Sequence, residues 1–457
     1  MSYSDDPVYH AVQQINHPTA IEPILIDTWN HWLGETPESL KVKPILTYYR
    51  PFNCARVVAE VTVLTSNAAE PLKLHMFFHS FADPDKVRHQ VNKGYELAVP
   101  PNAVLPVFAI NAWQTVVWTL PHAPCLPELT ELLQPDYFCP LLIAPDDLPI
   151  NPNDYPAPQI FRYVPFKRAI LTWDAPNGKH RYFVKLCQEL EFTQVVANFQ
   201  QIYAQSDQLS FKVPEPIAAD PVSRTFSMRA LPGQQFTTVM CQARPQLEPF
   251  KRVGQVLAEL HQTHLHPISV WTPAKEFRLF NIAMADVKLA LPHLAPSIDW
   301  ISNQLTELAN HIDFSSSYPI HANLFGDQIL YSGDQIGIVD WDTLSLGDPH
   351  YDVGRLIAHF LYLAGREQLA TKTVKTCIEA LLEGYESAIT WQLDRTCLAW
   401  HVTMQILLRG KISSLRKLPP HWQEDLEFVV AEAEWLLAGC SQYIVLPPLS
   451  QCFIAAS

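Results

Sequence analysis

The segment from Ile320 to Gly354 constrains the fold of this chain more than any other stretch. It contains two short apolar runs, QILY and IGIV, and the Gly and Asp of the intervening SGDQ favour a turn, so the runs are expected to form a small hairpin. The second run ends at Asp340 and Asp342. Two carboxylates at a strand end can bind a hard divalent cation together with phosphate groups. The segment therefore predicts a metal-binding strand end.

The residues on either side of this hairpin carry further polar groups. His321 lies before it, in a polar loop that the apolar tripeptide from Tyr318 to Ile320 introduces. After the hairpin, GDPHYD reads as a turn that closes on Asp352. This aspartate is placed to cap a helix, whose apolar positions are Val353, Leu356, Ile357 and Phe360.

This order of histidine loop, hairpin, Val-Asp-Trp-Asp and Gly-Asp-Pro-x-Tyr-Asp resembles the aminoglycoside phosphotransferase and choline kinase family. Members of that family generally read H-G-D-L-H-x-x-N, followed by a strand that ends V-I-D-W-[ED]. The first Asp is the catalytic base, and the Asn and the strand Asp bind metal. The resemblance implies an α+β, protein-kinase-like bilobal fold, with a β-rich N-lobe and a helical C-lobe. It also implies ATP and Mg²⁺ as cofactors.

The family motif transfers to this chain with two substitutions. His321 matches the motif histidine and Asp340 matches the metal aspartate, with Asp342 as a further metal ligand. Asn323 falls on the catalytic aspartate, and a neutral amide cannot accept the proton of a substrate hydroxyl as a carboxylate can. Gln328 falls on the metal asparagine.

These substitutions leave two candidates for the missing groups. The carbonyl oxygen of Gln328 can still ligate a cation, although the extra methylene moves it by about one bond length. Asp327, next to Gln328, is a candidate base or ligand. It stands one position away in the loop, which re-aims the side chain, and phosphoryl transfer depends on placement within roughly an ångström.

Lys185 is the candidate phosphate-binding residue of the N-lobe. From Phe161 onward, two β-rich runs are joined by a turn at PNG, and Lys185 lies in the second. It resembles the phosphate-pairing lysine of kinase-like N-lobes; the alternative is a solvated lysine on the open face of a strand. The amphipathic helix expected next carries no glutamate, so a lysine–glutamate pair would have to use Glu189 or Glu191 or be absent.

The next part of the chain resembles the hinge between kinase lobes. Met228 and Ala230 stand where backbone groups meet adenine in the family. An amphipathic helix follows and ends in HQTHLHP, whose three histidines suggest zinc. The alternative is an ordinary helix end, because basic residues and a following proline are favoured there. Beyond Asp352 the chain is predicted to be helical.

An additional α+β domain is expected at residues 1–155, before an N-lobe and hinge at 156–245 and a helical C-lobe at 246–457. YRPFNCA, from Tyr49 to Ala55, echoes YVPFKRA, from Tyr163 to Ala169. Either the first domain is a degenerate duplicated N-lobe, or the match is coincidence. In a duplication, Phe77 and Phe78 lie nearest the position of the lysine. The proline-rich residues 143–158 are predicted to be a semi-rigid linker.

Composition limits the partners of the chain. The net charge is −14, which argues against binding to nucleic acid or to anionic membranes and leaves room for a cationic small-molecule substrate. The nine cysteines include no C-x-x-C pair, which indicates free thiols in a reducing compartment. No signal peptide and no membrane span are recognisable, so a cytoplasmic protein is expected. The sequence leaves the oligomeric state and any protein partner open.

Three functional hypotheses follow. In the first, the chain is a pseudokinase that binds nucleotide through Lys185 and Asp340 and has a regulatory or interaction role. The second is an active ATP-dependent kinase that phosphorylates a hydroxyl of a small molecule, since phosphoryl transfer relies mainly on positioning and electrostatics. The third is a scaffold that binds no nucleotide.

Overall fold

The computed structural model describes residues 3–66, 70–96, 104–122, 126–315 and 317–444. The chain forms two compact units. The first comprises Met1–Phe192, Ile217–Ser227 and Leu415–Leu418; the second comprises Thr193–Pro216, Met228–Ser414 and Pro419–Ser457. The division into an N-terminal domain, an N-lobe and a C-lobe at residues 155 and 245 stays a prediction.

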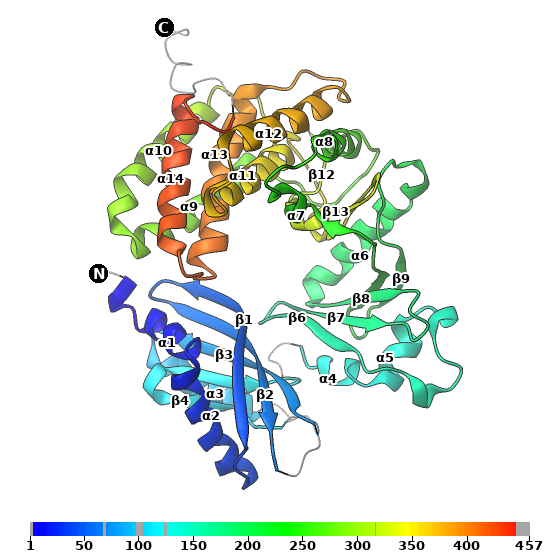
Figure 1. The fold of residues 1–457 in the computed structure, drawn as a ribbon, viewed down its shortest axis with the longest axis vertical. Coiled ribbons are helices and arrows are strands. Elements are labelled where there is room, and N and C mark those ends of the chain that lie inside the picture. Colours follow the sequence, from blue (N-terminus) through cyan, green and yellow to red (C-terminus); the bar gives the residue numbers. More distant parts are fainter. Residues whose placement is uncertain (1–2, 67–69, 97–103, 123–125, 316, 445–457) are drawn as a thin grey trace. The chain divides into compact units, whose positions relative to one another are not determined.

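The first unit begins with two helices and a five-stranded sheet (Figure 1). Helices α1 (Pro7–Ile15) and α2 (Pro18–Leu33) precede the sheet, and the Asp6 side chain caps α1 by accepting a hydrogen bond from the Val8 N–H (2.8 Å). The strand order is β1-β2-β3-β5-β4. The bounds are β1 Ser39–Arg50, β2 Cys54–Leu64, β3 Leu72–Phe81, α3 Pro84–Glu96, β4 Phe108–Ile110 and β5 Thr115–Thr119.

A second five-stranded sheet follows helices α4 (Leu129–Leu132) and α5 (Pro135–Leu142). Its order is β6-β7-β8-β10-β9. The bounds are β6 Gln159–Val164, β7 Arg168–Asp174, β8 Arg181–Cys187, α6 Glu189–Tyr203, β9 Pro216–Asp220 and β10 Thr225–Arg229. Both sheets thus run through three antiparallel strands, a helix and two further strands, with the same spatial order. Apolar residues of the two sheets form one core, which includes Phe77, Trp118, Tyr163 and Leu171.

The two similar heptapeptides occupy equivalent turns of these sheets. Tyr49–Ala55 spans the β1–β2 turn and Tyr163–Ala169 spans the β6–β7 turn. Phe52 (φ 51°) and Phe166 (φ 62°) both adopt the left-handed backbone conformation, which is uncommon for a bulky residue. Whether the sheets arose by duplication stays a prediction.

The strand register corrects the expectation that Phe77 and Phe78 stand nearest the position of Lys185. Ile170, which follows the second heptapeptide, pairs with Lys185, and the equivalent Arg56 pairs with His79. His79 is buried, and burial, followed by the charge of Arg56, lowers its pKa to about 3. A neutral imidazole therefore stands in the first sheet where a lysine stands in the second.

The second unit is mainly helical. Its helices are α7 Phe236–Met240, α8 Glu248–His261, α9 Pro273–Ala290, α10 Ala295–Ala309, α11 His350–Arg366, α12 Thr371–Glu386, α13 Arg395–Gly410 and α14 Trp422–Ala438. Short strands complete it, namely β11 Gln234–Gln235, β12 Tyr318–Ile320, β13 Ile329–Ser332, β14 Gln335–Ile338 and β15 Ser345–Gly347. Helix α11 is buried over almost its whole length and forms the centre of this unit.

Two glycines allow the helices α8 and α12 of this unit to pack closely. A Cβ atom on Gly254 of α8 would lie 2.1 Å from the Leu381 carbonyl oxygen, and one on Gly384 of α12 would lie 2.0 Å from that of Lys251. The backbones of α8 and α12 therefore touch where both residues lack a side chain (Figure 1).

Two global findings complete the description. Within the described ranges, no helix is long and apolar enough to cross a membrane. Every cysteine in that part of the chain is a free thiol.

Glu432 should make the stability of the fold depend on pH. It is fully buried in α14, Ser441 Oγ donates to its Oε1, and burial raises its pKa from 4.5 to about 7. The folded state therefore holds an extra proton between these values, and the free energy of unfolding should fall by about 3 kcal/mol as pH rises through this window. Glu432→Gln should remove that loss in urea titrations at several pH values. The exposed Glu427→Gln is the control, and equal pH profiles for wild type and Glu432→Gln would contradict the assignment.

Candidate functional site

The chain from β12 to β15 builds the candidate site of the second unit. β13 and β14 pair antiparallel, with Ser332 opposite Gln335, so the predicted hairpin is confirmed. β12 pairs with β15, which returns the chain to the strand that precedes His321. A 3₁₀ turn at Gly326–Gln328 leads into β13, and another at Trp341–Thr343 follows Asp340. The loop and the strand end are thereby held at neighbouring positions.

Asp352 holds the loop in place from the first turn of α11. Its Oδ2 accepts a hydrogen bond from the His321 N–H (2.6 Å) and its Oδ1 from the Ala322 N–H (3.0 Å). Burial acts to raise the pKa of this carboxyl, but the hydrogen bond and charge of His261 and the neighbouring His321 hold it below its ordinary value. The expectation that Asp352 caps α11 is wrong, because the helix begins at His350 and the carboxylate points to the loop instead.

His321 connects the loop to the strand end. Its Nε2 lies 2.9 Å from the carbonyl oxygen of Val339, and its own carbonyl accepts the Thr343 hydroxyl (2.9 Å). The side chain is fully buried, and these contacts position the backbone on either side of Asp340. The prediction that His321 acts in catalysis is not tested by these contacts.

Asp340 stands in a strained backbone conformation. Its φ is 70°, in the left-handed region that costs a non-glycine residue of order 1 kcal/mol or more. The turn after it is held by the buried Asn198 of α6, whose Nδ2 lies 3.3 Å, 3.1 Å and 3.4 Å from the carbonyl oxygens of Trp341, Asp342 and Leu344. These contacts thus hold the backbone of the turn that follows Asp340.

Asn323, at the position of the family base, lies against a buried arginine. Its Oδ1 accepts a hydrogen bond from Arg355 Nη2 (2.9 Å). The same guanidinium donates through Nη1 to Gln405 Oε1 (2.7 Å) and to the Tyr351 hydroxyl (3.0 Å), and it lies 4.2 Å from the centre of the Phe325 ring. The amide is therefore one member of a fixed polar chain.

The two candidate replacements both contact the protein itself. Asp327 is exposed, and its Oδ1 accepts the Thr237 hydroxyl at 2.5 Å. Gln328 Oε1 accepts the backbone N–H of Phe325 at 2.9 Å, which closes its own turn. The structure thus places both side chains at the loop. Oδ1 of Asp327 and Oε1 of Gln328 each accept one hydrogen bond from the protein.

The N-lobe candidates lie on the second sheet and its exit. Lys185 is a buried residue of β8, which disfavours the alternative of a fully solvated lysine. Glu191 forms an ion pair with Lys167 (3.5 Å). Met228 is buried in β10, and Ala230 follows the end of that strand. Lys185 belongs to the first unit and Asp340 to the second.

The zinc interpretation of HQTHLHP receives no support. His261 is buried and bonds the Tyr385 hydroxyl through Nδ1 (2.8 Å). Among the described residues, the histidine, cysteine and carboxylate side chains that gather closely enough to hold an ion are Asp348, Cys397 and His401, not the histidines of this motif. Helix α8 ends at His261, so this histidine lies in its last turn, and His264 and His266 follow the helix.

Sequence reasoning missed two residues that shape the site. Asn198 had a detectable signal, because it is a polar residue on the otherwise apolar face of the predicted helix, three positions after Val195. Arg355 had none, since it lies within a helix whose neighbouring positions are all buried, so that periodicity distinguishes no solvent face.

The chain was compared with protein-family models and with curated proteins. Residues 168–395 match the model of the Phosphotransferase enzyme family, and this part of the chain belongs to that family. The family is one of kinase-like phosphotransferases, so the α+β kinase-like fold with an added N-terminal part is confirmed. No curated protein matches the chain.

Solved structures that the chain matches include antibiotic and choline kinases. A spectinomycin phosphotransferase, in complex with ADP and spectinomycin, is 14% identical with a TM-score of 0.43, over 63% of this chain and 94% of that one. A choline/ethanolamine kinase family protein from Mesorhizobium loti is 13% identical with a TM-score of 0.44, over 63% and 91%. A choline kinase from Streptococcus pneumoniae is 12% identical with a TM-score of 0.42, over 61% and 93%.

Asp352→Asn should loosen the loop. An amide can accept only through its oxygen, so one of the two backbone N–H groups would face an NH₂ group, and the change should cost about 3 kcal/mol of unfolding free energy. Because the folded pKa of Asp352 is lowered, its contribution is complete above the ordinary carboxyl range and is lost as pH falls through the lowered value. Urea titration measures the loss, and hydrogen exchange should locate it at His321 and Ala322. The exposed Asp334→Asn is the control; equal effects of the two changes would contradict the role.

Proposed function

We propose that this protein is a catalytically impaired member of the phosphotransferase family that retains nucleotide binding. Its role in this proposal is regulation or interaction, not efficient phosphate transfer. The observation that carries the proposal is the contact between Asn323 Oδ1 and Arg355 Nη2 at 2.9 Å.

The amide of Asn323 and its contact with Arg355 each argue against a base function at this position. The amide of Asn323 is not basic at neutral pH, so it cannot take the proton of an attacking hydroxyl. Its oxygen, the only acceptor atom of the side chain, is already directed to a guanidinium. Loss of a general base costs about 10²- to 10⁴-fold in rate.

The neighbouring residues do not supply an equivalent group at the same position. The Asp327 carboxylate accepts the hydroxyl of Thr237, and the Gln328 carbonyl accepts the N–H of Phe325. A base at Asp327 would have to act from a shifted position in the loop. These two contacts therefore support impairment over rescue.

In contrast to the base position, the residues expected to bind nucleotide and metal have side chains that suit this role. Asp340 and Asp342 are half-buried carboxylates around one turn. Mg²⁺ in nucleotide sites is commonly held by one or two carboxylates, with phosphates and water as its other ligands. Asp340 and Asp342 would hold the ion, and Lys185 would bind phosphate oxygens as a point charge. When bound, Mg²⁺ would neutralise phosphate charge.

Nucleotide titration tests the binding half of the proposal. Calorimetry and the shift in melting temperature with ATP, with and without Mg²⁺, should show saturable binding, since a ligand selective for the folded state stabilises it. Lys185→Ala and Asp340→Ala should each weaken binding at least about tenfold, because each removes a charged contact worth more than about 1.4 kcal/mol. The exposed Lys179→Ala and Asp334→Asn should not. Absence of binding even at high ATP concentration would leave the hypothesis of a scaffold that binds no nucleotide.

Turnover separates the impaired enzyme from an active kinase. Wild-type ATP hydrolysis or transfer should fall far below the 1–100 s⁻¹ typical of kinases. A turnover within that range that Asp340→Ala abolishes would establish the active small-molecule kinase instead.

Rebuilding the family motif tests the cause of impairment. Asn323→Asp with Gln328→Asn restores a carboxylate and a shorter amide, but Arg355 would then neutralise the new carboxylate and lower its basicity. The double change should therefore raise ATP turnover by less than tenfold, and adding Arg355→Gln should raise it further, toward about 10²-fold. Melting temperatures of all variants check that Arg355→Gln still folds. A double variant as active as the triple would show that Arg355 does not suppress the base.

A further inference from the structure

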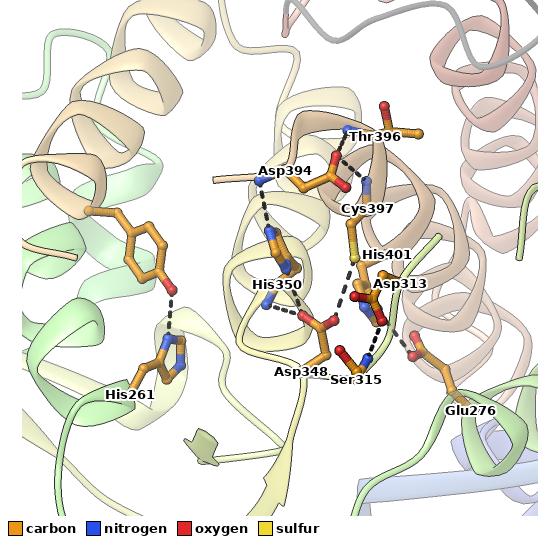
Figure 2. A network of polar contacts seen from close by, with 11 residues as sticks. His261, Glu276, Asp313, Ser315, Asp348, His350, Asp394, Thr396, Cys397 and His401 are labelled. Atoms are coloured by element: carbon orange, nitrogen blue, oxygen red, sulfur yellow. Dashed lines mark hydrogen bonds and ion pairs between the residues drawn. The ribbon is translucent and has the colours of Figure 1, made fainter. Parts of the chain in front are cut away.

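A second polar cluster lies in the same unit, at the start of α11 and on one face of α13. Asp348 lies just before α11, and Cys397 and His401 stand four positions apart on α13, which places them one above the other. All three side chains are buried. One ligand atom of each lies within 4.8 Å of the others. Figure 2 shows the carboxylate of Asp348 and the thiol of Cys397 directed toward each other.

Neighbouring groups hold two members of the cluster in position. Asp348 Oδ1 accepts the backbone N–H (2.8 Å) and Nδ1–H (2.6 Å) of His350, while Oδ2 lies 3.6 Å from Cys397 Sγ. The Asp394 N–H donates to His350 Nε2 (3.1 Å), and the Asp394 carboxylate caps α13 by accepting the Cys397 N–H (3.2 Å). These contacts, drawn in Figure 2, direct one carboxylate oxygen and the thiol to the same point.

The third member has one ring nitrogen without a partner. His401 Nδ1 lies 3.2 Å from Oε2 of Glu276, at ion-pair distance. His401 Nε2 is buried without a hydrogen-bond partner. Buried polar atoms without partners are uncommon in native proteins, and one explanation for them is a bound ion.

We propose that Asp348, Cys397 and His401 bind a zinc ion. Binding transfers the thiol proton of Cys397 to solvent, so that a thiolate, a carboxylate and a neutral imidazole surround Zn²⁺ and offset its two charges. Three protein ligands and one water complete a tetrahedral set.

The distances suit this ion after a small contraction. With Zn–S of about 2.3 Å and Zn–O of about 2.1 Å, two ligand atoms of one tetrahedral zinc lie roughly 3.6 Å apart. The Sγ–Oδ2 distance of 3.6 Å already has this value. Separations up to 4.8 Å elsewhere in the cluster require a contraction of about 1 Å.

The outer contacts match those of protein zinc sites. A ligating histidine commonly faces a carboxylate with its other ring nitrogen, and a ligating carboxylate is itself hydrogen-bonded. Glu276 is the carboxylate that faces His401, and its Oε1 accepts Gln405 Nε2–H (2.5 Å). His350 is the hydrogen-bond donor to the Asp348 carboxylate. The mixture of sulfur, nitrogen and oxygen favours zinc over Mg²⁺ or Ca²⁺, which prefer oxygen alone.

The first experiment uses the wild-type protein. Elemental analysis after reconstitution with one equivalent of ZnCl₂ and gel filtration should find about one zinc per chain. Cobalt substitution should give a thiolate-to-cobalt charge-transfer band, which reports sulfur coordination directly. A zinc content near zero, or bound cobalt without that band, would overturn the proposal and leave His401 as a buried imidazole in an ion pair with Glu276.

Variants locate the site. Cys397→Ser should lower zinc affinity by more than about 100-fold in competition with a chromophoric chelator, and Glu276→Gln by about 10- to 100-fold. Cys377→Ser is the matched control, because Cys377 is an equally buried thiol of α12 outside the cluster. Equal losses in Cys377→Ser and Cys397→Ser would also overturn the assignment. Neither readout depends on nucleotide or on phosphate transfer, so the zinc site stands or fails separately from the proposed function.

Discussion

The carboxylate of Asp352 is the contact on which the geometry of the candidate site depends. It is fully buried and accepts the consecutive N–H groups of His321 and Ala322. Ala322 has a φ of 59°, a conformation that a non-glycine residue adopts only when surrounding contacts impose it. From there His321 reaches the carbonyl of Val339 and so sets the approach to Asp340. One buried charge thus fixes both the loop and the strand end.

A second chain of contacts joins this loop to the proposed zinc site. Arg355 donates to Asn323 and to Gln405, and Gln405 donates to Glu276, which lies beside His401. In a buried chain of this kind, a change of charge at one end alters the strength of the hydrogen bonds along it. The same arginine that contacts Asn323 is therefore linked through Gln405 to the carboxylate of Glu276. This link gives Arg355 a structural role that does not involve transfer chemistry.

The parts of the fold that depend on local pattern could be predicted from the sequence. The β13–β14 hairpin followed from a Gly-Asp turn between apolar runs, and α6 and α11 from apolar spacing. The position of Asn323 followed from the family motif. The direction of the Asp352 side chain could not be predicted, because an aspartate in the first turn of a helix serves equally as a cap or as a distant anchor. The pairing of Asn323 with Arg355 joins residues 32 positions apart, and no spacing rule reports it.

The two five-stranded sheets show why equal topology does not imply equal function. His79 and Lys185 occupy equivalent register positions, and both side chains are buried. His79 remains neutral, because burial and Arg56 disfavour its protonation, and it packs against Phe81 and Phe166. A neutral imidazole among aromatic rings cannot offer the point charge that a phosphate requires. If the sheets are duplicates and Lys185 binds phosphate as proposed, the first sheet has core packing in place of that contact. Nucleotide binding should then depend on Lys185 and not on His79.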